Sequence, residues 1–173
     1  MSLSRASLAL CEGGFLETIL PIRVFATLTA PRQLSQERLF YSFRVWVLQI
    51  QCHEKLTLGW VRSIETRPQR HIHGALVAAA PLDCDFAERV WRRIVAPKYA
   101  DAARVEPYLK GCCGLGYILK TLDTPYEGAE FSPNLSAFAL NNPATHFRTN
   151  LAQRRQRRRI DAQLQAHKKD FAQ

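Results

Sequence analysis

The sequence predicts an α+β fold, in which helices pack on one mainly antiparallel sheet. Segments with strand-like and helix-like patterns of apolar residues alternate along the chain, and two predicted strands follow each other across a short polar turn. The chain has 173 residues, of which 47% are hydrophobic and 23% are charged. It is long enough for the core of one domain, and too apolar to be disordered throughout.

The first half of the chain is predicted to form a strand, a helix and a hairpin. Residues 1–20 show no clear period and are interpreted as a loose lead-in. Ile22–Thr29 alternates and is rich in β-branched residues, which predicts a strand. A helix is predicted over 35–53, with Ser35 as its N-cap and with an apolar face made of Leu39, Phe43, Trp46, Val47 and Ile50. Residues 58–66 and 71–80 then form an antiparallel hairpin around the turn at 67–70.

The second half adds a helix, a strand and a third helix. The second helix is predicted over 85–95, with Asp85 as its cap, Glu88 completing a capping box, and a buried stripe of Phe86, Val90 and Ile94. A weaker strand follows at 102–109 and a helix at 112–122. The order β-α-β-β-α-β-α is typical of ferredoxin-like sandwiches. We therefore expect a lead-in at 1–21, one folded domain at 22–123, and a proline-containing connector with a basic tail at 124–173.

Charge and cysteine content narrow the class of protein. Lys and Arg number 24 against 15 Asp and Glu, a net charge of +9, which favours a polyanionic partner. No apolar run reaches the roughly 18 residues of a membrane span, so no membrane association is expected. The sequence has five cysteines, an odd number, and no CxxC motif. This disfavours a disulfide scaffold or a structural zinc site and favours free thiols in a reducing cytoplasm.

The sharpest local feature is the pair His71 and His73. Residues two apart on a strand point to the same face, so the two imidazoles form half of a metal site. Glu65 ends the preceding strand and would complete the set if a loop of odd length, or a bulge, puts it opposite His71. Imidazole with carboxylate suits Mg²⁺ or Mn²⁺ holding a phosphate. The alternative is two half-exposed histidines and a solvated carboxylate paired with Arg67 or Arg70.

The third predicted helix carries a tyrosine and a lysine on one face. Leu115, Ile118, Leu119 and Leu122 cluster on one side of this helix, whereas Tyr117 and Lys120 fall on the other. A phenol beside a cation and a metal-polarised phosphate is an activated nucleophile. The alternative is an ordinary exposed Tyr and Lys on an amphipathic helix. Tyr108, at a predicted strand end, is a rival nucleophile. Gly111, Gly114 and Gly116 either let a DNA backbone approach or serve packing.

Three short motifs, in this order, resemble those of the HUH endonuclease family, the rolling-circle replication initiators of plasmids and phages. Phe25-Ala26-Thr27-Leu28-Thr29 is similar to the first motif, His71-Ile72-His73 matches the second, and Tyr117-Ile118-Leu119-Lys120 matches the third. The resemblance covers roughly residues 22–123 and is to the single-tyrosine members. Glu65 lies where many members place a third metal ligand.

The resemblance implies a nicking and rejoining enzyme acting on single-stranded DNA at a replication origin. Metal on His71, His73 and Glu65 would polarise the scissile phosphate, Tyr117 would form a 5′-phosphotyrosyl intermediate, and Lys120 would position the phosphate. A first alternative is a non-catalytic Rep-like module that binds DNA and regulates replication. A second is a small RNA-binding protein stacking bases on Trp60 and Phe25.

The basic tail is expected to contact nucleic acid. Residues 148–173 hold eight Lys and Arg against two Asp, and the tail has no aromatic apolar face for a membrane. The alternative is a solvated or disordered helix end. The residues expected to bind nucleic acid are Arg70, Arg154, Arg155, Arg157, Arg158 and Arg159.

Overall fold

Five strands and four α-helices make up the part of the chain that the computed structural model describes, which is residues 5–31, 34–65, 70–95, 103–112, 114–120 and 128–139. The helices are α1 (Arg5–Ile19), α2 (Gln36–Glu54), α3 (Cys84–Val95) and α4 (Gly114–Leu119). The strands are β1 (Ile22–Thr29), β2 (Gly59–Glu65), β3 (His71–Val77), β4 (Ala103–Pro107) and β5 (Glu130–Phe131), and a short 3₁₀ helix, η1, covers Leu135–Phe138.

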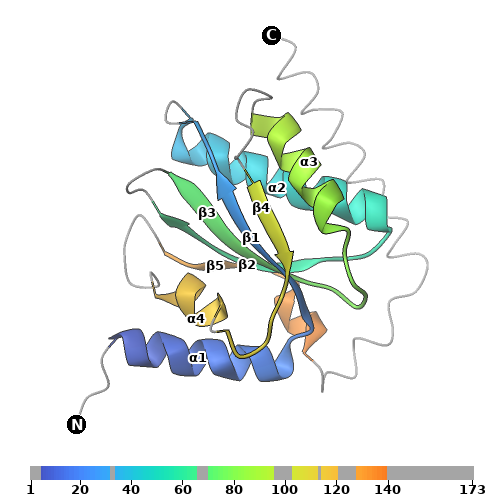
Figure 1. Cartoon of the computed structure of the whole chain (residues 1–173). Helices are drawn as coiled ribbons and strands as arrows, with labels where there is room; N and C mark the ends of the chain where they lie inside the picture. Colours follow the sequence, from blue (N-terminus) through green and yellow to red (C-terminus); the bar gives the residue numbers. More distant parts are fainter. Residues whose placement is uncertain are drawn as a thin grey trace.

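The strands form one antiparallel sheet in the order β4-β1-β3-β2-β5 (Figure 1). From β1 to β4 the elements follow the predicted β-α-β-β-α-β order, and the two helices α2 and α3 return the chain across the sheet. The α+β prediction of a mainly antiparallel sheet is therefore confirmed, as a ferredoxin-like arrangement with β5 added beside β2.

Two separate cores cover the two faces of the sheet. On one face α2 and α3 pack on Val24, Ala26 and Leu28 of β1, together with apolar residues of β2 and β3. On the other face Val61, Ala75 and Val77 pack with α4, η1 and the end of α1. Figure 1 shows α2 and α3 on one side of the sheet, and α1 and α4 together on the other. The period-2 alternation of β1 is what allows one strand to serve both cores.

The expected loose lead-in is wrong, because residues 5–19 form the helix α1. This helix packs on α4 through two glycines: a Cβ on Gly13 would lie 2.4 Å from the backbone nitrogen of Gly116. The apolar residues of α1 do not gather on one face, so the segment lacks the periodicity that predicts a helix. Its stability depends on a tertiary contact.

Helix caps agree with the prediction at α2 and differ at α3. Ser35 accepts a hydrogen bond from the backbone N–H of Arg38, as expected of an N-cap. The predicted Asp85 cap is wrong: Asp83 accepts the bond from Phe86 N–H, and the helix begins at Cys84. Glu88 makes no capping box, and instead accepts the backbone N–H of Val105 on β4.

Arg62 of β2 lies buried between the sheet and α2, with 1% of its side chain exposed. It forms an ion pair with Glu130 of β5 at 2.6 Å, and its guanidinium carbon lies 4.0 Å from the ring centroid of Phe40. Burial lowers the pKa of Arg62, although the Glu130 carboxylate opposes this. The pair ties the short strand β5 to the sheet.

Among the described residues no helix is both long and apolar enough to cross a membrane. The boundary at residue 123 and the basic tail fall outside the described residues.

Candidate metal centre

Strand register brings Glu65 and the two histidines to one face of the sheet. Glu65 is the direct cross-strand partner of His71, and Ser63 that of His73. Five residues separate the two strands, and this odd number puts Glu65 on the same face as His71, as predicted. All three side chains therefore point to the face that carries α1 and α4, at the end of the β2–β3 hairpin.

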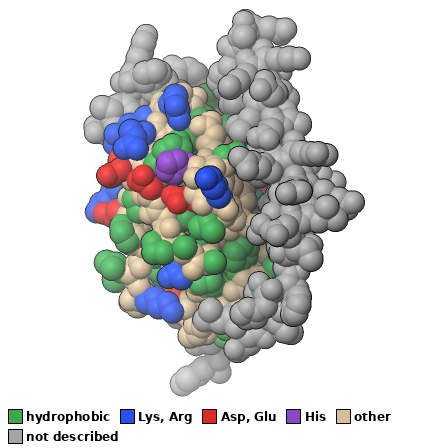
Figure 2. Space-filling view, turned by 90° about the vertical axis from the view of Figure 1, so that its right-hand side faces the viewer, with side chains coloured by type: hydrophobic (Ala, Val, Ile, Leu, Met, Phe, Trp, Pro, Cys, Tyr) green, Lys and Arg blue, Asp and Glu red, His purple; other side chains and the backbone are tan. Residues whose placement is uncertain are grey.

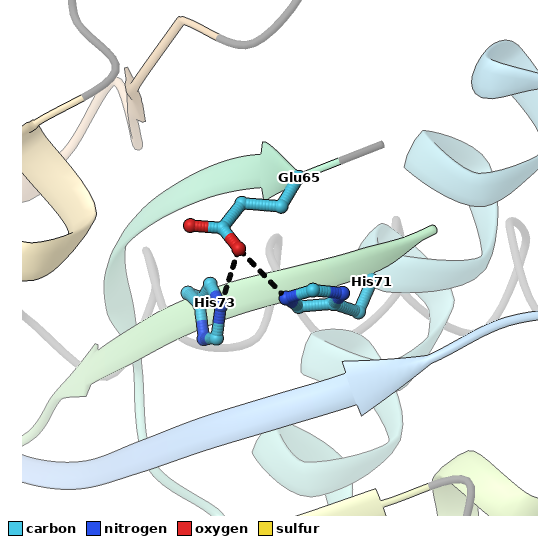
Figure 3. A group of neighbouring side chains, drawn as sticks. All are labelled: Glu65, His71 and His73. Carbon is cyan, nitrogen blue, oxygen red and sulfur yellow. Dashed lines mark ion pairs between the residues drawn. The ribbon is translucent and has the colours of Figure 1, made fainter. Parts of the chain in front are cut away.

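The three side chains converge on one small volume (Figure 3). The Glu65 Oε2 atom lies 3.1 Å from Nε2 of His71 and 3.7 Å from Nε2 of His73, and one ligand atom from each residue falls within 4.8 Å of the others. The two imidazole rings stand nearly perpendicular, with centroids 4.5 Å apart. These residues could hold a metal ion, with one carboxylate and two nitrogen ligands.

His73 has three properties that suit a metal ligand. Its Nδ1 lies 3.3 Å from Oγ1 of Thr27 on β1, which fixes the ring. Its Nε2 is buried and has no hydrogen-bond partner among the described residues. Burial, and then the neighbouring His71, lower the pKa of His73 to about 4, so the ring is neutral at pH 7. A neutral imidazole whose buried Nε2 makes no hydrogen bond within the described part of the chain, and lies 3.7 Å from the Glu65 carboxylate, fits a metal ion.

Glu65 divides its two oxygens between the histidines and Lys120. Its Oε2 faces the imidazoles, whereas its Oε1 lies 2.5 Å from Nζ of Lys120. Burial opposes ionisation, but the hydrogen bonds and charge of Lys120 outweigh it and hold the pKa of the carboxyl below its ordinary value. The same contact raises the pKa of Lys120, against its own burial. Lys120 therefore orients the carboxylate.

Tyr117 lies directly beside the histidine pair. Its ring centroid is 4.7 Å from that of His73, edge to face, and Nζ of Lys120 lies 3.3 Å from the Tyr117 ring centroid. The Tyr117 side chain is 42% exposed, and after Lys120 it is a further neighbour that holds the pKa of the Glu65 carboxyl below its ordinary value. Tyr117 on α4 and Lys120, the residue after α4, thus lie against the predicted metal ligands, which come from β2 and β3. Figure 2, which views the side that lies to the right in Figure 1, shows basic and acidic side chains interspersed with hydrophobic ones.

Tyr108, the rival nucleophile, has its hydroxyl engaged elsewhere. The hydroxyl donates to the carboxylate of Glu17, and it accepts the backbone N–H of Leu115 at 3.2 Å. Glu17 also accepts the backbone N–H of Gly111 at 3.1 Å. Sequence reasoning missed Glu17, because its position in α1 gives no local sign that its partners lie more than ninety residues away. Through Glu17, α1 fixes the loop that leads into α4.

Of the residues predicted to bind nucleic acid, Arg70 is the one that the structure describes, and its guanidinium is engaged away from the centre. Arg70 precedes His71, and its guanidinium donates to the backbone carbonyl of Leu34. Arg154, Arg155, Arg157, Arg158 and Arg159 lie outside the described residues. Gly116 packs against Gly13, and Gly114 lies under the ring of Tyr108, which supports the packing role for both.

Comparison of the chain with protein families, with curated proteins and with solved structures finds no significant match.

Proposed function

We propose that this protein is a metal-dependent endonuclease and strand transferase that nicks and rejoins single-stranded DNA through Tyr117. The observation that carries the proposal is the convergence of Tyr117 and Lys120 on the Glu65, His71 and His73 cluster. Each of these features is common alone, but a metal-ligating set with an exposed phenol and a cation against it is the constellation of nucleophilic phosphoryl transfer.

The metal we propose is Mg²⁺ or Mn²⁺, held by Glu65, His71 and His73. When bound, it supplies a Lewis acid for the scissile phosphate. Tyr117 loses its phenolic proton to solvent, and its oxygen forms a bond to phosphorus while the bond from phosphorus to the 3′ oxygen breaks. The 3′ oxygen gains a proton, which leaves a 5′-phosphotyrosyl protein and a free 3′-hydroxyl. Lys120 lies against the Tyr117 ring and orients Glu65.

Rejoining follows from the same chemistry in reverse. The phosphotyrosyl bond keeps the phosphodiester energy, so a 3′-hydroxyl can attack it and release Tyr117. Initiation of rolling-circle replication at an origin, in the cytoplasm, is the role that we propose for such a reaction. The net charge of +9 supports a nucleic-acid substrate.

A non-catalytic DNA-binding module is the second candidate, and the same basic charge favours it. Such a module needs neither a neutral His73 nor an exposed phenol beside it. The RNA-binding alternative is less favoured, because Trp60 faces the α2 side of the sheet, where it packs on Phe43 with ring centroids 5.4 Å apart.

A nicking assay tests the proposal. The protein is incubated with Mn²⁺ and a broad pool of labelled single-stranded oligonucleotides, and covalent adducts are resolved on denaturing gels. We expect an adduct with the native protein, and none with Tyr117→Phe, with His73→Ala or with EDTA. Tyr41→Phe is the matched control, because Tyr41 is 37% exposed and lies on α2, away from the centre. An adduct that survives Tyr117→Phe, or salt-sensitive DNA binding with no adduct, would overturn the proposal.

A further inference from the structure

A pocket of about 370 Å³ opens beside the candidate metal centre. It lies between the end of β4 and α4, and His73 and Tyr117 form the wall that it shares with the centre. The rest of its lining includes Phe25, Glu106, Tyr108 and Leu109. Its volume is near the lower limit of ligand-binding cavities, which run from about 300 to 1,000 Å³, so it suits one small ring system.

The pocket walls are aromatic and apolar, and they are held in place. Phe25 lies parallel to His73 within 25°, with ring centroids 6.0 Å apart. The ring of Tyr108 is fixed through its hydroxyl, which bonds to Glu17 and to the backbone of Leu115. Leu109 is 68% exposed, which core packing does not explain. A pocket whose lining includes several aromatic rings is the kind of site that takes a flat ring by stacking.

The chemistry of the walls sets the direction in which a nucleotide would bind. Away from the centre the lining offers rings, a proline, a leucine and the carboxylate of Glu106, which is held by Arg104 at 2.8 Å. None of these would hold a phosphate in the pocket. The described residues that line the pocket include no Lys or Arg, and their one imidazole, His73, lies on the side of the metal centre, where Lys120 pairs with Glu65.

We propose that this pocket takes one nucleobase, that of the nucleotide whose phosphate lies at the metal centre. The inference rests on the proposed function, and it deepens that function by placing one nucleotide of the DNA strand. Because His73 and Tyr117 line both spaces, the stacked base fixes the distance of its own phosphate from the Tyr117 oxygen. Base stacking in the pocket therefore positions the DNA strand for attack by Tyr117.

The test follows backbone amide signals by NMR during titration of the native protein, in Mg²⁺, with dAMP. The matched ligand is 2-deoxyribose 5-phosphate, which lacks the base. We expect the amides of Tyr108, Leu109 and Gly114 to shift with dAMP and not with the sugar phosphate. Equal shifts with both ligands would overturn the inference.

Two variants test whether dAMP binds in this pocket or elsewhere on the surface. Leu109→Ala removes one wall, and we expect it to weaken dAMP binding about 3- to 10-fold. Phe15→Ala is the matched control, because Phe15 is 62% exposed and lies on α1 outside this pocket, so its dAMP affinity should equal that of the native protein. Equal affinities of the two variants would contradict the inference.

Failure of the pocket and failure of the nuclease give different results. Selective dAMP binding with no Mn²⁺-dependent adduct would support the pocket and overturn the proposed cleavage. If the adduct forms but dAMP does not bind selectively, each nucleotide flanking the nick is replaced in turn by an abasic one. An adduct yield that is unchanged at every position would support the nuclease and overturn the pocket.

Discussion

The contact between α1 and α4 can be tested with two adjacent glycines. A Cβ on Gly13 would lie 2.4 Å from the backbone nitrogen of Gly116, 2.7 Å from its Cα and 3.0 Å from the carbonyl carbon of Leu115. These are backbone atoms, which no rotamer change can move away. A Cβ on Gly14 would meet nothing within 4 Å. The two alanine variants therefore share the same gain in helix propensity and differ only in the contact with α4.

The expected difference in stability follows from that comparison. Gly14→Ala should raise the free energy of unfolding by about 0.5–1 kcal/mol. Gly13→Ala forces the two helices apart, and overpacking of this kind costs about 1–3 kcal/mol. Gly13→Ala should therefore be less stable than Gly14→Ala by about 1–3 kcal/mol, or by about 2–12 °C in Tm.

Urea unfolding followed by circular dichroism measures this difference. Adduct formation at Tyr117 gives a second readout, because α4 carries Tyr117: Gly13→Ala should slow it, and Gly14→Ala should not. If both variants are equally stabilised, α1 does not lie against α4, and the reasoning about the loop and the nucleophile is refuted.

Three further predictions concern charge and metal. Mn²⁺ at 100 times its Kd should raise the free energy of unfolding by about 2.7 kcal/mol. Thermal scans should show that Glu65→Gln loses this stabilisation. Equal stabilisation of the two proteins would exclude Glu65 as a metal ligand. Because burial lowers the pKa of His73 to about 4, below the unfolded value of about 6.5, only the unfolded chain gains this proton between those pH values. Metal-free stability should therefore fall from pH 6.5 to pH 4, by up to about 3 kcal/mol. Urea midpoints should show this fall reduced in His73→Gln and kept in His53→Gln, whose side chain is 44% exposed; equal slopes would contradict it. Finally, Arg62→Met should leave the free energy of unfolding nearly unchanged. Glu130→Ala leaves a buried guanidinium unpaired and should lower the free energy of unfolding by about 1–3 kcal/mol. Urea unfolding that shows Arg62→Met to be the less stable variant would refute this account of the pair.

The part of the centre on the hairpin could be predicted from the sequence. The period of two fixes which residues of β3 share a face, and the length of the loop decides whether Glu65 joins them. Both are local properties of a short segment. The amphipathic pattern of the helix predicted at 112–122 likewise placed Tyr117 and Lys120 away from the leucine side, although the observed helix α4 ends at Leu119.

The supporting contacts could not be predicted, because they join distant segments. Glu17 reaches Tyr108 and Gly111, and nothing near Glu17 in the sequence marks it as a partner of either. The pocket is formed by β1, β4 and α4, so no single motif contains it. The position of Lys120 on Glu65 also depends on how α4 packs over the sheet.

Peptide mapping of the covalent adduct by mass spectrometry tests the central proposal most directly. The native protein is treated with single-stranded DNA and Mn²⁺, digested with nuclease and protease, and searched for a tyrosine that carries a 5′-nucleotide. We expect the modification on Tyr117, in Mn²⁺ and not in EDTA. A modification on Tyr108, or one that forms equally well in EDTA, would contradict a metal-assisted Tyr117 nucleophile.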